Sequence, residues 1–230
     1  METSFEQRVQ MTAVQFGPFL LAVVFHEFAH GLVARLWGDK TAQEQGRLTL
    51  NPIAHIDPIG TIAFPLMNML LGINLLIGWA KPVPIDPRRF RKFRLGLFFV
   101  AAAGPMMNFF IAILSALLFG ALVAWAPDDF YFKEPFLLMA QTSVFLNYAL
   151  GIFNLIPLPP LDGSKIIESM LPIHLAARYE RLAQYSFLLI MGLLFLGAFQ
   201  YLSIPITFLG KATLIGAAHL FGITATSEGL

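Results

Sequence analysis

The sequence has no cysteine and few charged residues. Asp, Glu, Lys and Arg make up 13% of its 230 residues, whereas a soluble domain usually contains about a quarter. The composition therefore excludes an ordinary soluble domain. The absence of Cys also excludes disulfides and thiolate ligands, so any zinc site would have to use His and carboxylates. The formal net charge of +1 gives no reason to expect a nucleic-acid partner.

Long apolar stretches are abundant instead. Hydrophobic residues make up 57% of the chain, and a helix that crosses a lipid bilayer needs about 20 predominantly apolar residues. We therefore expect an all-α polytopic membrane protein with about six transmembrane or re-entrant segments. The last two segments are so close in sequence that a tight hairpin is expected. The six segments are residues 12–37, 56–78, 95–126, 135–157, 182–201 and 204–222.

Two stretches near the N-terminal third depart from a regular transmembrane helix. Residues 56–78 are interrupted by proline and glycine, which predicts a kinked or re-entrant path. Residues 38–55 are more polar, and within them residues 47–50 alternate polar and apolar side chains. This alternation predicts a short β-strand or hairpin between the first two apolar segments.

The chain shows no sign of a second domain. No polar stretch reaches the roughly 50 residues that a separate domain needs. The first apolar run lacks a small-residue cleavage site, so we expect no cleavable signal peptide. We predict a single membrane-embedded domain over residues 1–230, with core elements at residues 12–37, 95–126 and 135–171.

Charged residues are unevenly distributed between the apolar segments. Lys and Arg gather in residues 81–94 and again in residues 165–181, whereas three of the four charged residues in 128–134 are acidic. Because cytoplasmic loops are enriched in Lys and Arg, we expect the two basic regions to face the cytosol and the acidic loop to face outward. We interpret the basic run as a topology determinant that contacts lipid headgroups.

A five-residue motif, His26-Glu27-Phe28-Ala29-His30, lies inside the first apolar segment. Two His residues four positions apart share one face of a helix, where both imidazoles can bind one Zn²⁺. The intervening Glu can then act on a zinc-bound water. Because an ionisable side chain in an apolar helix costs several kcal/mol, a functional role for this motif is favoured over a chance occurrence.

A carboxylate lies in a second irregular stretch, residues 154–163. Three prolines in four positions, at residues 157, 159 and 160, cannot continue a helix. Non-helical backbone at membrane depth is tolerated only beside protein or a water-filled cavity. Asp162 in this stretch is therefore a candidate third zinc ligand, although it could instead cap a helix that begins at Gly163.

Taken together, these motifs resemble those of the site-2 protease family of intramembrane zinc metalloproteases, and in particular its compact prokaryotic branch, which lacks a PDZ domain. The resemblance covers residues 26–163 by motif and nearly the whole chain by hydrophobic pattern. It rests on five stretches in the expected order, namely residues 26–30, 50–52, 78–84, 103–108 and 154–163.

The resemblance implies a metal centre and an activity. His26, His30 and Asp162 would bind one zinc ion per chain, and Glu27 would be the general base. The implied function is an intramembrane zinc endopeptidase that hydrolyses peptide bonds in or near transmembrane segments by Glu-assisted attack of zinc-bound water. Its partners would be transmembrane protein or peptide substrates and the lipid bilayer. Its location would be the cell membrane of a prokaryote, as a multi-pass protein.

Three further polar residues are candidates for the active site. The resemblance suggests that Asn108 and Asn154 line it, and an amide such as Asn154 could donate a hydrogen bond to the developing negative charge. Asn108 could equally be an interhelical hydrogen-bonding residue. His55 could contact the zinc or the substrate, or have a structural role at the membrane boundary.

Several alternatives remain open at this point. A metal-ion transporter could use the same polar residues, although no internal inverted symmetry supports it. A catalytically inactive relative that binds membrane segments is also conceivable, although no expected ligand or base is missing. The depth of the zinc and the direction of the first helix stay undecided, and so does the substrate. Residues 47–50 are our hypothesis for an edge that pairs with an unwound substrate.

Overall fold

The computed structural model describes residues 4–71 and 78–223, and all regular elements in these ranges are helices. The predicted all-α class is confirmed. Four helices of the described chain are long and apolar enough to cross a membrane. Three of them are α1 (Phe5–Trp37), α4 (Phe93–Trp125) and α5 (Lys133–Asn154), and the fourth, Gln200–Leu220, contains α9 (Ser203–Leu220).

The predicted count of about six segments is not confirmed. In the region of residues 56–78, the π-helical turn η2 (Pro58–Ala63) continues into α3 (Phe64–Leu71), and the described part of this apolar stretch is shorter than the roughly 20 residues that a spanning helix needs. Residues 72–77 of that predicted segment lie outside the described residues.

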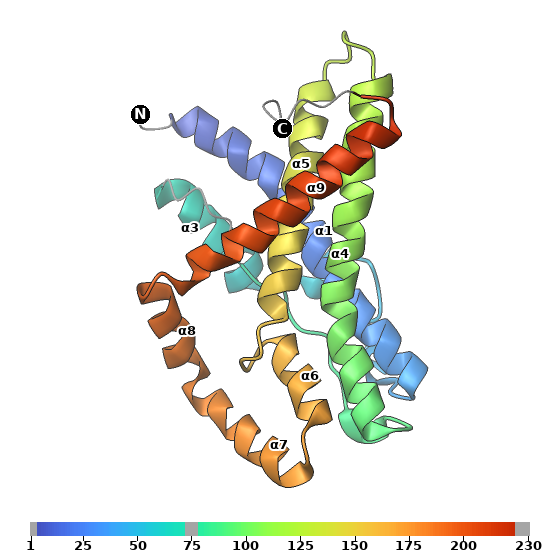
Figure 1. The fold of residues 1–230 in the computed structure, drawn as a ribbon, viewed down its shortest axis with the longest axis vertical. Coiled ribbons are helices and arrows are strands. Elements are labelled where there is room, and N and C mark those ends of the chain that lie inside the picture. The colour runs from blue at the N-terminus through green and yellow to red at the C-terminus, as the bar shows by residue number, and fades with distance from the viewer. Residues whose placement is uncertain (1–3, 72–77, 224–230) are drawn as a thin grey trace.

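The predicted segment at residues 182–201 is also broken. It contains η4 (Arg181–Tyr185), the ten-residue α8 (Ser186–Phe195) and η5 (Ala198–Leu202). Gly197 adopts a left-handed backbone conformation, with φ of 68°, at the break between α8 and η5. Figure 1 shows α8 and α9 diverging instead of lying side by side as the expected tight hairpin would.

The predicted β-strand near residues 47–50 is wrong. Residues 38–55 are all described, and they contain the short helices α2 (Thr41–Glu44) and η1 (Pro52–His55) but no strand. The backbone N–H groups of Arg47 and Leu48 both donate to the carbonyl of Ala42, at 2.8 and 3.2 Å. These local bonds close a turn after α2, so the two amides are not available to a neighbouring strand.

The core is a bundle of α1, α4, α5 and α9. Figure 1 shows α4 and α5 running antiparallel and in contact, with α1 and α9 crossing them at an angle. Small buried residues such as Ala112 and Ala116 on α4 pack against Val144 of α5 and Leu214 of α9. Small side chains let helices approach closely, which is how helices gain packing energy inside a membrane.

The loop after α1 and the basic stretch before α4 lie at the same end of the molecule. The backbone N–H of Arg91 donates to the carbonyl of Trp37 at 2.8 Å, which joins the end of α1 to the basic stretch before α4. The turn between α4 and α5 lies at the opposite end, where Lys133 pairs with Asp128 at 2.7 Å. The basic and acidic regions therefore lie at opposite ends of α4, as the expected topology requires.

The carboxylate of Asp39, just after α1, links the end of this helix to the extended segment that follows residue 78. Asp39 is 1% exposed, and its carboxylate accepts hydrogen bonds from the backbone of Thr41 at 2.9 Å and of Asp86 at 2.7 Å. The hydroxyl of Thr41 donates to the same carboxylate. One buried side chain thus holds the end of α1 against the segment before α4.

We expect Asp39→Ala to lower the free energy of unfolding by about 1–3 kcal/mol, because it leaves two backbone donors without an acceptor. The thermal midpoint of the purified protein in detergent measures this. Asp129→Ala removes an exposed carboxylate and is the matched control, with an expected midpoint close to that of the wild type. Equal midpoints for the two variants would contradict the role of Asp39.

Candidate metal centre

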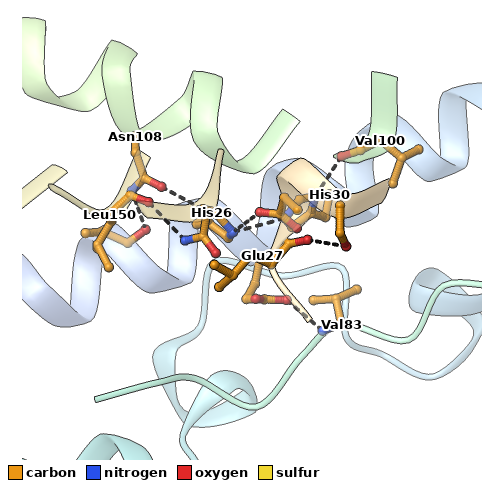
Figure 2. A network of polar contacts seen from close by, with 12 residues as sticks. His26, Glu27, His30, Val83, Val100, Asn108 and Leu150 are labelled. Atoms are coloured by element: carbon orange, nitrogen blue, oxygen red, sulfur yellow. Dashed lines mark hydrogen bonds and ion pairs between the residues drawn. The ribbon is translucent and has the colours of Figure 1, made fainter. Parts of the chain in front are cut away.

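Two imidazoles project from the same face of α1. His26 and His30 are one helical turn apart, and they are 8% and 6% exposed. Their Nε2 atoms lie 3.0 Å from each other. Figure 2 shows both rings directed toward the same point between α1 and α4. The predicted pairing of these two His side chains is therefore present in the fold.

A carboxylate from α6 (Asp162–Met170) reaches the same point. Asp162 Oδ2 lies 3.1 Å from Nε2 of His26 and 3.3 Å from Nε2 of His30. The helix begins at Asp162 itself, with Leu161 as its N-cap. The alternative in which Asp162 caps a helix that starts at Gly163 is therefore wrong, because Asp162 lies inside the helix.

Hydrogen bonds at the Nδ1 atoms determine which nitrogen of each imidazole carries the hydrogen. Nδ1 of His30 lies 2.7 Å from the carbonyl oxygen of Val100, which can only accept, so Nδ1 carries the hydrogen. Nδ1 of His26 lies 2.6 Å from Oδ1 of Asn108, and this amide oxygen also only accepts. In the neutral rings both Nε2 atoms then present a lone pair toward Asp162.

This arrangement fits a zinc ion. The buried Oδ2 of Asp162 has no hydrogen-bond partner, and it faces the two imidazole Nε2 atoms at 3.1 and 3.3 Å. A cation between these three atoms removes their mutual repulsion. Tetrahedral zinc with bonds of about 2.0–2.1 Å separates its ligand atoms by about 3.3–3.4 Å. Within the described residues, this is the group of His and carboxylate side chains suited to a metal ion.

Two glycines let the helices approach closely enough to assemble the cluster. A Cβ at Gly104 of α4 would lie 2.4 Å from Nε2 of His30 and 2.6 Å from Nε2 of His26. A Cβ at Gly163 would lie 2.2 Å from the carbonyl oxygen of Leu155, at the end of α5. The first glycine leaves room for the imidazoles, and the second lets the start of α6 pack against α5.

The carboxylate of Glu27 is held from another direction. Its Oε2 accepts a hydrogen bond from the backbone N–H of Val83 at 2.8 Å (Figure 2). The carbonyl of Pro82, in the same peptide unit, accepts from Nη2 of Arg47 at 3.2 Å. Arg47 also binds the carbonyl of Lys81, at 2.9 Å. The Pro82–Val83 peptide therefore links the Arg47 cation to Glu27.

Our sequence reasoning missed this link. A signal was present, because Val83 lies between Pro82 and Pro84 and is the one residue of the three with a backbone N–H. Nothing in the local sequence indicates that this N–H reaches Glu27, 56 positions away.

The remaining sequence candidates have different surroundings. Asn108 is fully buried against His26. Asn154 is half-buried at the last turn of α5, and its Nδ2 donates to the carbonyl of Leu150 at 3.0 Å. His55 is fully buried, and its Nε2 lies 2.8 Å from the carbonyl oxygen of Thr49. Among the described residues His55 is not a member of the metal cluster.

Comparison with known proteins finds related sequences. The model of a family described as peptidase family M50 matches residues 132–197. The chain is 35% identical over 197 residues to "Putative zinc metalloprotease YwhC" of Bacillus subtilis, covering 85% of this chain and 86% of that protein. It is 28% identical over 176 residues to "Putative zinc metalloprotease Rip2" of Mycolicibacterium smegmatis, covering 76% and 64% respectively. No solved structure matches the chain.

We expect Gly104→Ala to reduce the zinc content of the purified protein at least about tenfold, because the new Cβ displaces both imidazoles. Metal analysis per chain measures this directly. Gly216→Ala on α9 is the matched control, since a Cβ there meets nothing within 4 Å, and it should leave the zinc content unchanged. Zinc bound by Gly104→Ala at the wild-type level would be inconsistent with the geometry described above.

Proposed function

The chain belongs to peptidase family M50, and on that basis we propose that His26, His30 and Asp162 hold one zinc ion per chain. The protein is an intramembrane zinc metalloprotease. The observation that carries the assignment of these three ligands is the convergence of two imidazole nitrogens and a carboxylate oxygen on one point, where the carboxylate oxygen has no hydrogen-bond partner.

We assign the general base to Glu27. When bound, zinc supplies a Lewis acid that polarises a peptide carbonyl and acidifies water. Glu27 takes a proton from the attacking water as the water oxygen bonds to the carbonyl carbon. It then returns the proton to the nitrogen of the leaving amine as the C–N bond breaks. The Val83 amide holds Oε2 of Glu27 in one position, so little reorganisation is needed during the reaction.

The two asparagines receive different roles. Asn108 orients His26 through its amide oxygen. Asn154 is our candidate donor to the negative charge that develops on the carbonyl oxygen, because it lies at the helix break that leads to Asp162. In this role its Nδ2 would exchange the carbonyl of Leu150 for the substrate.

The position of the cluster along α4 supports cleavage inside the bilayer. Val100 and Asn108 of α4 contact His30 and His26, and α4 runs from Phe93 to Trp125. Its 33 residues span about 50 Å, whereas the hydrocarbon core is about 30 Å thick. The cluster thus lies beside the part of α4 between its basic end and its midpoint. If the middle of α4 lies at the middle of the bilayer, this part of the helix lies within the hydrocarbon core.

The substrates that fit such a site are transmembrane segments. A helical peptide hides its carbonyl groups in backbone hydrogen bonds, so segments with helix-breaking residues should be cleaved preferentially. We propose a single domain over residues 1–230 and a location in the plasma membrane of a prokaryote. Transport and inactive binding are not favoured, because the related proteins are named as zinc metalloproteases.

We expect Glu27→Gln to keep its zinc and to lose cleavage by about 10²–10⁴-fold, the usual contribution of a general base. The test measures zinc per chain and follows the cleavage of single-span membrane proteins in detergent. Glu44→Gln changes an exposed glutamate that pairs with Arg89, and it should cleave at the wild-type rate. His26→Ala, His30→Ala and Asp162→Ala should lose both zinc and cleavage.

The results separate the alternatives. Zinc binding without cleavage by the wild-type protein, across substrates with and without helix-breaking residues, would contradict the protease assignment. Zinc flux into liposomes that is unaffected by Glu27→Gln would favour transport.

We expect Arg47→Met to lower kcat about tenfold with unchanged zinc content, because it removes the charge that holds the Pro82–Val83 peptide against Glu27. Arg47→Lys should restore part of the rate. Lys92→Met removes an exposed cation near the start of α4 and serves as the control for net charge. A rise in KM at constant kcat would show that Arg47 acts on substrate binding instead.

A further inference from the structure

Three polar side chains are buried between α4 and α5, and the mechanism above does not use them. Asn147 is fully buried, and Ser115 and Ser143 are each 9% exposed. Polar groups inside a membrane-spanning bundle are costly unless they are hydrogen-bonded, and they commonly serve a function. All three belong to one hydrogen-bonded chain that ends at His26.

The direction of this chain is set by a backbone carbonyl. Nδ2 of Asn147 donates to the carbonyl oxygen of Ser143 at 2.9 Å and to the Ser143 hydroxyl oxygen at 3.2 Å. A carbonyl oxygen can only accept, so the NH₂ group of Asn147 must lie on the Ser143 side. The oxygen of the Asn147 amide then faces the opposite side, toward Asn108.

The same logic continues through the second amide. Nδ2 of Asn108 donates to Oδ1 of Asn147 at 2.9 Å. With its NH₂ group on that side, Asn108 presents Oδ1 to Nδ1 of His26, at 2.6 Å. That oxygen requires a hydrogen on Nδ1, which leaves the Nε2 of a neutral His26 free to bind a metal.

We propose that Asn147 is a positioning residue for the metal centre, which acts through Asn108 to keep the hydrogen of His26 on Nδ1. The inference rests on the proposed function, because it takes His26 to be a zinc ligand. If both amides turned over, Nδ1 of His26 would face an NH₂ group, and the hydrogen would move to Nε2. The ring would then present N–H to the metal position and could not bind zinc.

A second hydrogen bond of Asn108 limits how much zinc affinity a change at Asn147 can remove. The other hydrogen of Asn108 Nδ2 points to the carbonyl oxygen of Ala22, at the longer distance of 3.3 Å. Ala22 therefore retains part of the orientation when Asn147 is changed. We accordingly expect a loss of zinc affinity near the lower end of the 10–100-fold range found for groups that orient metal ligands.

His30 provides an internal comparison. Its Nδ1 bonds directly to the carbonyl of Val100, at 2.7 Å, without an intervening side chain. A change at Asn147 should therefore alter the hydrogen position in His26 and leave that in His30 unchanged.

The first test compares zinc affinities of full-length protein in detergent by competition with a chelator. We expect Asn147→Leu to bind zinc about tenfold more weakly than the wild type, and Asn108→Leu to bind more weakly still. The double variant should match Asn108→Leu alone, because Asn147 acts through Asn108. Ser115→Ala removes the bond between the two serine hydroxyls but leaves both amides intact, and it should stay within about twofold of the wild type.

A conservative variant separates orientation from packing. Asn147→Asp keeps an oxygen that accepts from Asn108 in either protonation state, so it should bind zinc nearly as well as the wild type. The isosteric leucine variant lacks that oxygen. Equal zinc affinities of the wild type and Asn147→Leu, or equal losses in the leucine and aspartate variants, would overturn the inference.

A second readout follows the ring nitrogens themselves. In metal-free protein with ¹⁵N-labelled histidine, at a pH high enough for both rings to be neutral, NMR spectra show which nitrogen carries the hydrogen. Asn147→Leu should increase the Nε2–H form of His26 and leave His30 in its Nδ1–H form; an unchanged His26 would count against the inference. Failure of the wild type to bind zinc at all would instead contradict the proposed function, so the two failures are distinguishable.

Discussion

The structure depends on one electrostatic constraint, which is that two imidazole nitrogens and a carboxylate oxygen meet at a single point between the helices. Nε2 of His26, Nε2 of His30 and Oδ2 of Asp162 lie 3.0–3.3 Å apart. Such a cluster is stable when a cation lies at its centre. Two glycines on neighbouring helices provide the space that the cluster needs.

Around the cluster, backbone carbonyls determine where hydrogens lie. Val100 fixes His30 directly, and Ser143 fixes His26 through two amides. A carbonyl oxygen cannot change its role from acceptor to donor, so these directions do not depend on mobile protons. The interior of a helix bundle contains little water that could substitute for a lost partner. The packing of α4 against α5 therefore also orients the ligand His26, because it brings Asn147 of α5 to Asn108 of α4.

Irregular backbone supplies the other half of the site. The extended segment around Val83 and the helix break before Asp162 both carry closely spaced prolines. Proline removes N–H groups, so the amide that remains between two prolines has a defined partner, Glu27. In the first segment the carbonyl groups of Lys81 and Pro82 bind Arg47. The polar groups of this non-helical segment are thus hydrogen-bonded by other parts of the protein, as irregular backbone inside a bilayer would require.

The sequence alone determined the all-α membrane class, the pairing of His26 with His30 and the candidacy of Asp162, because helical spacing, composition and proline content are local properties. The prediction of about six transmembrane or re-entrant segments is not confirmed, since four helices of the described chain are long and apolar enough to cross a membrane. The predicted strand near residues 47–50 is wrong, since local alternation does not reveal where backbone hydrogen bonds go. Only the tertiary structure connected Asn147 and Arg47 to the site. Their partners are far away in sequence, and hydrogen-bond direction is decided by three-dimensional contact.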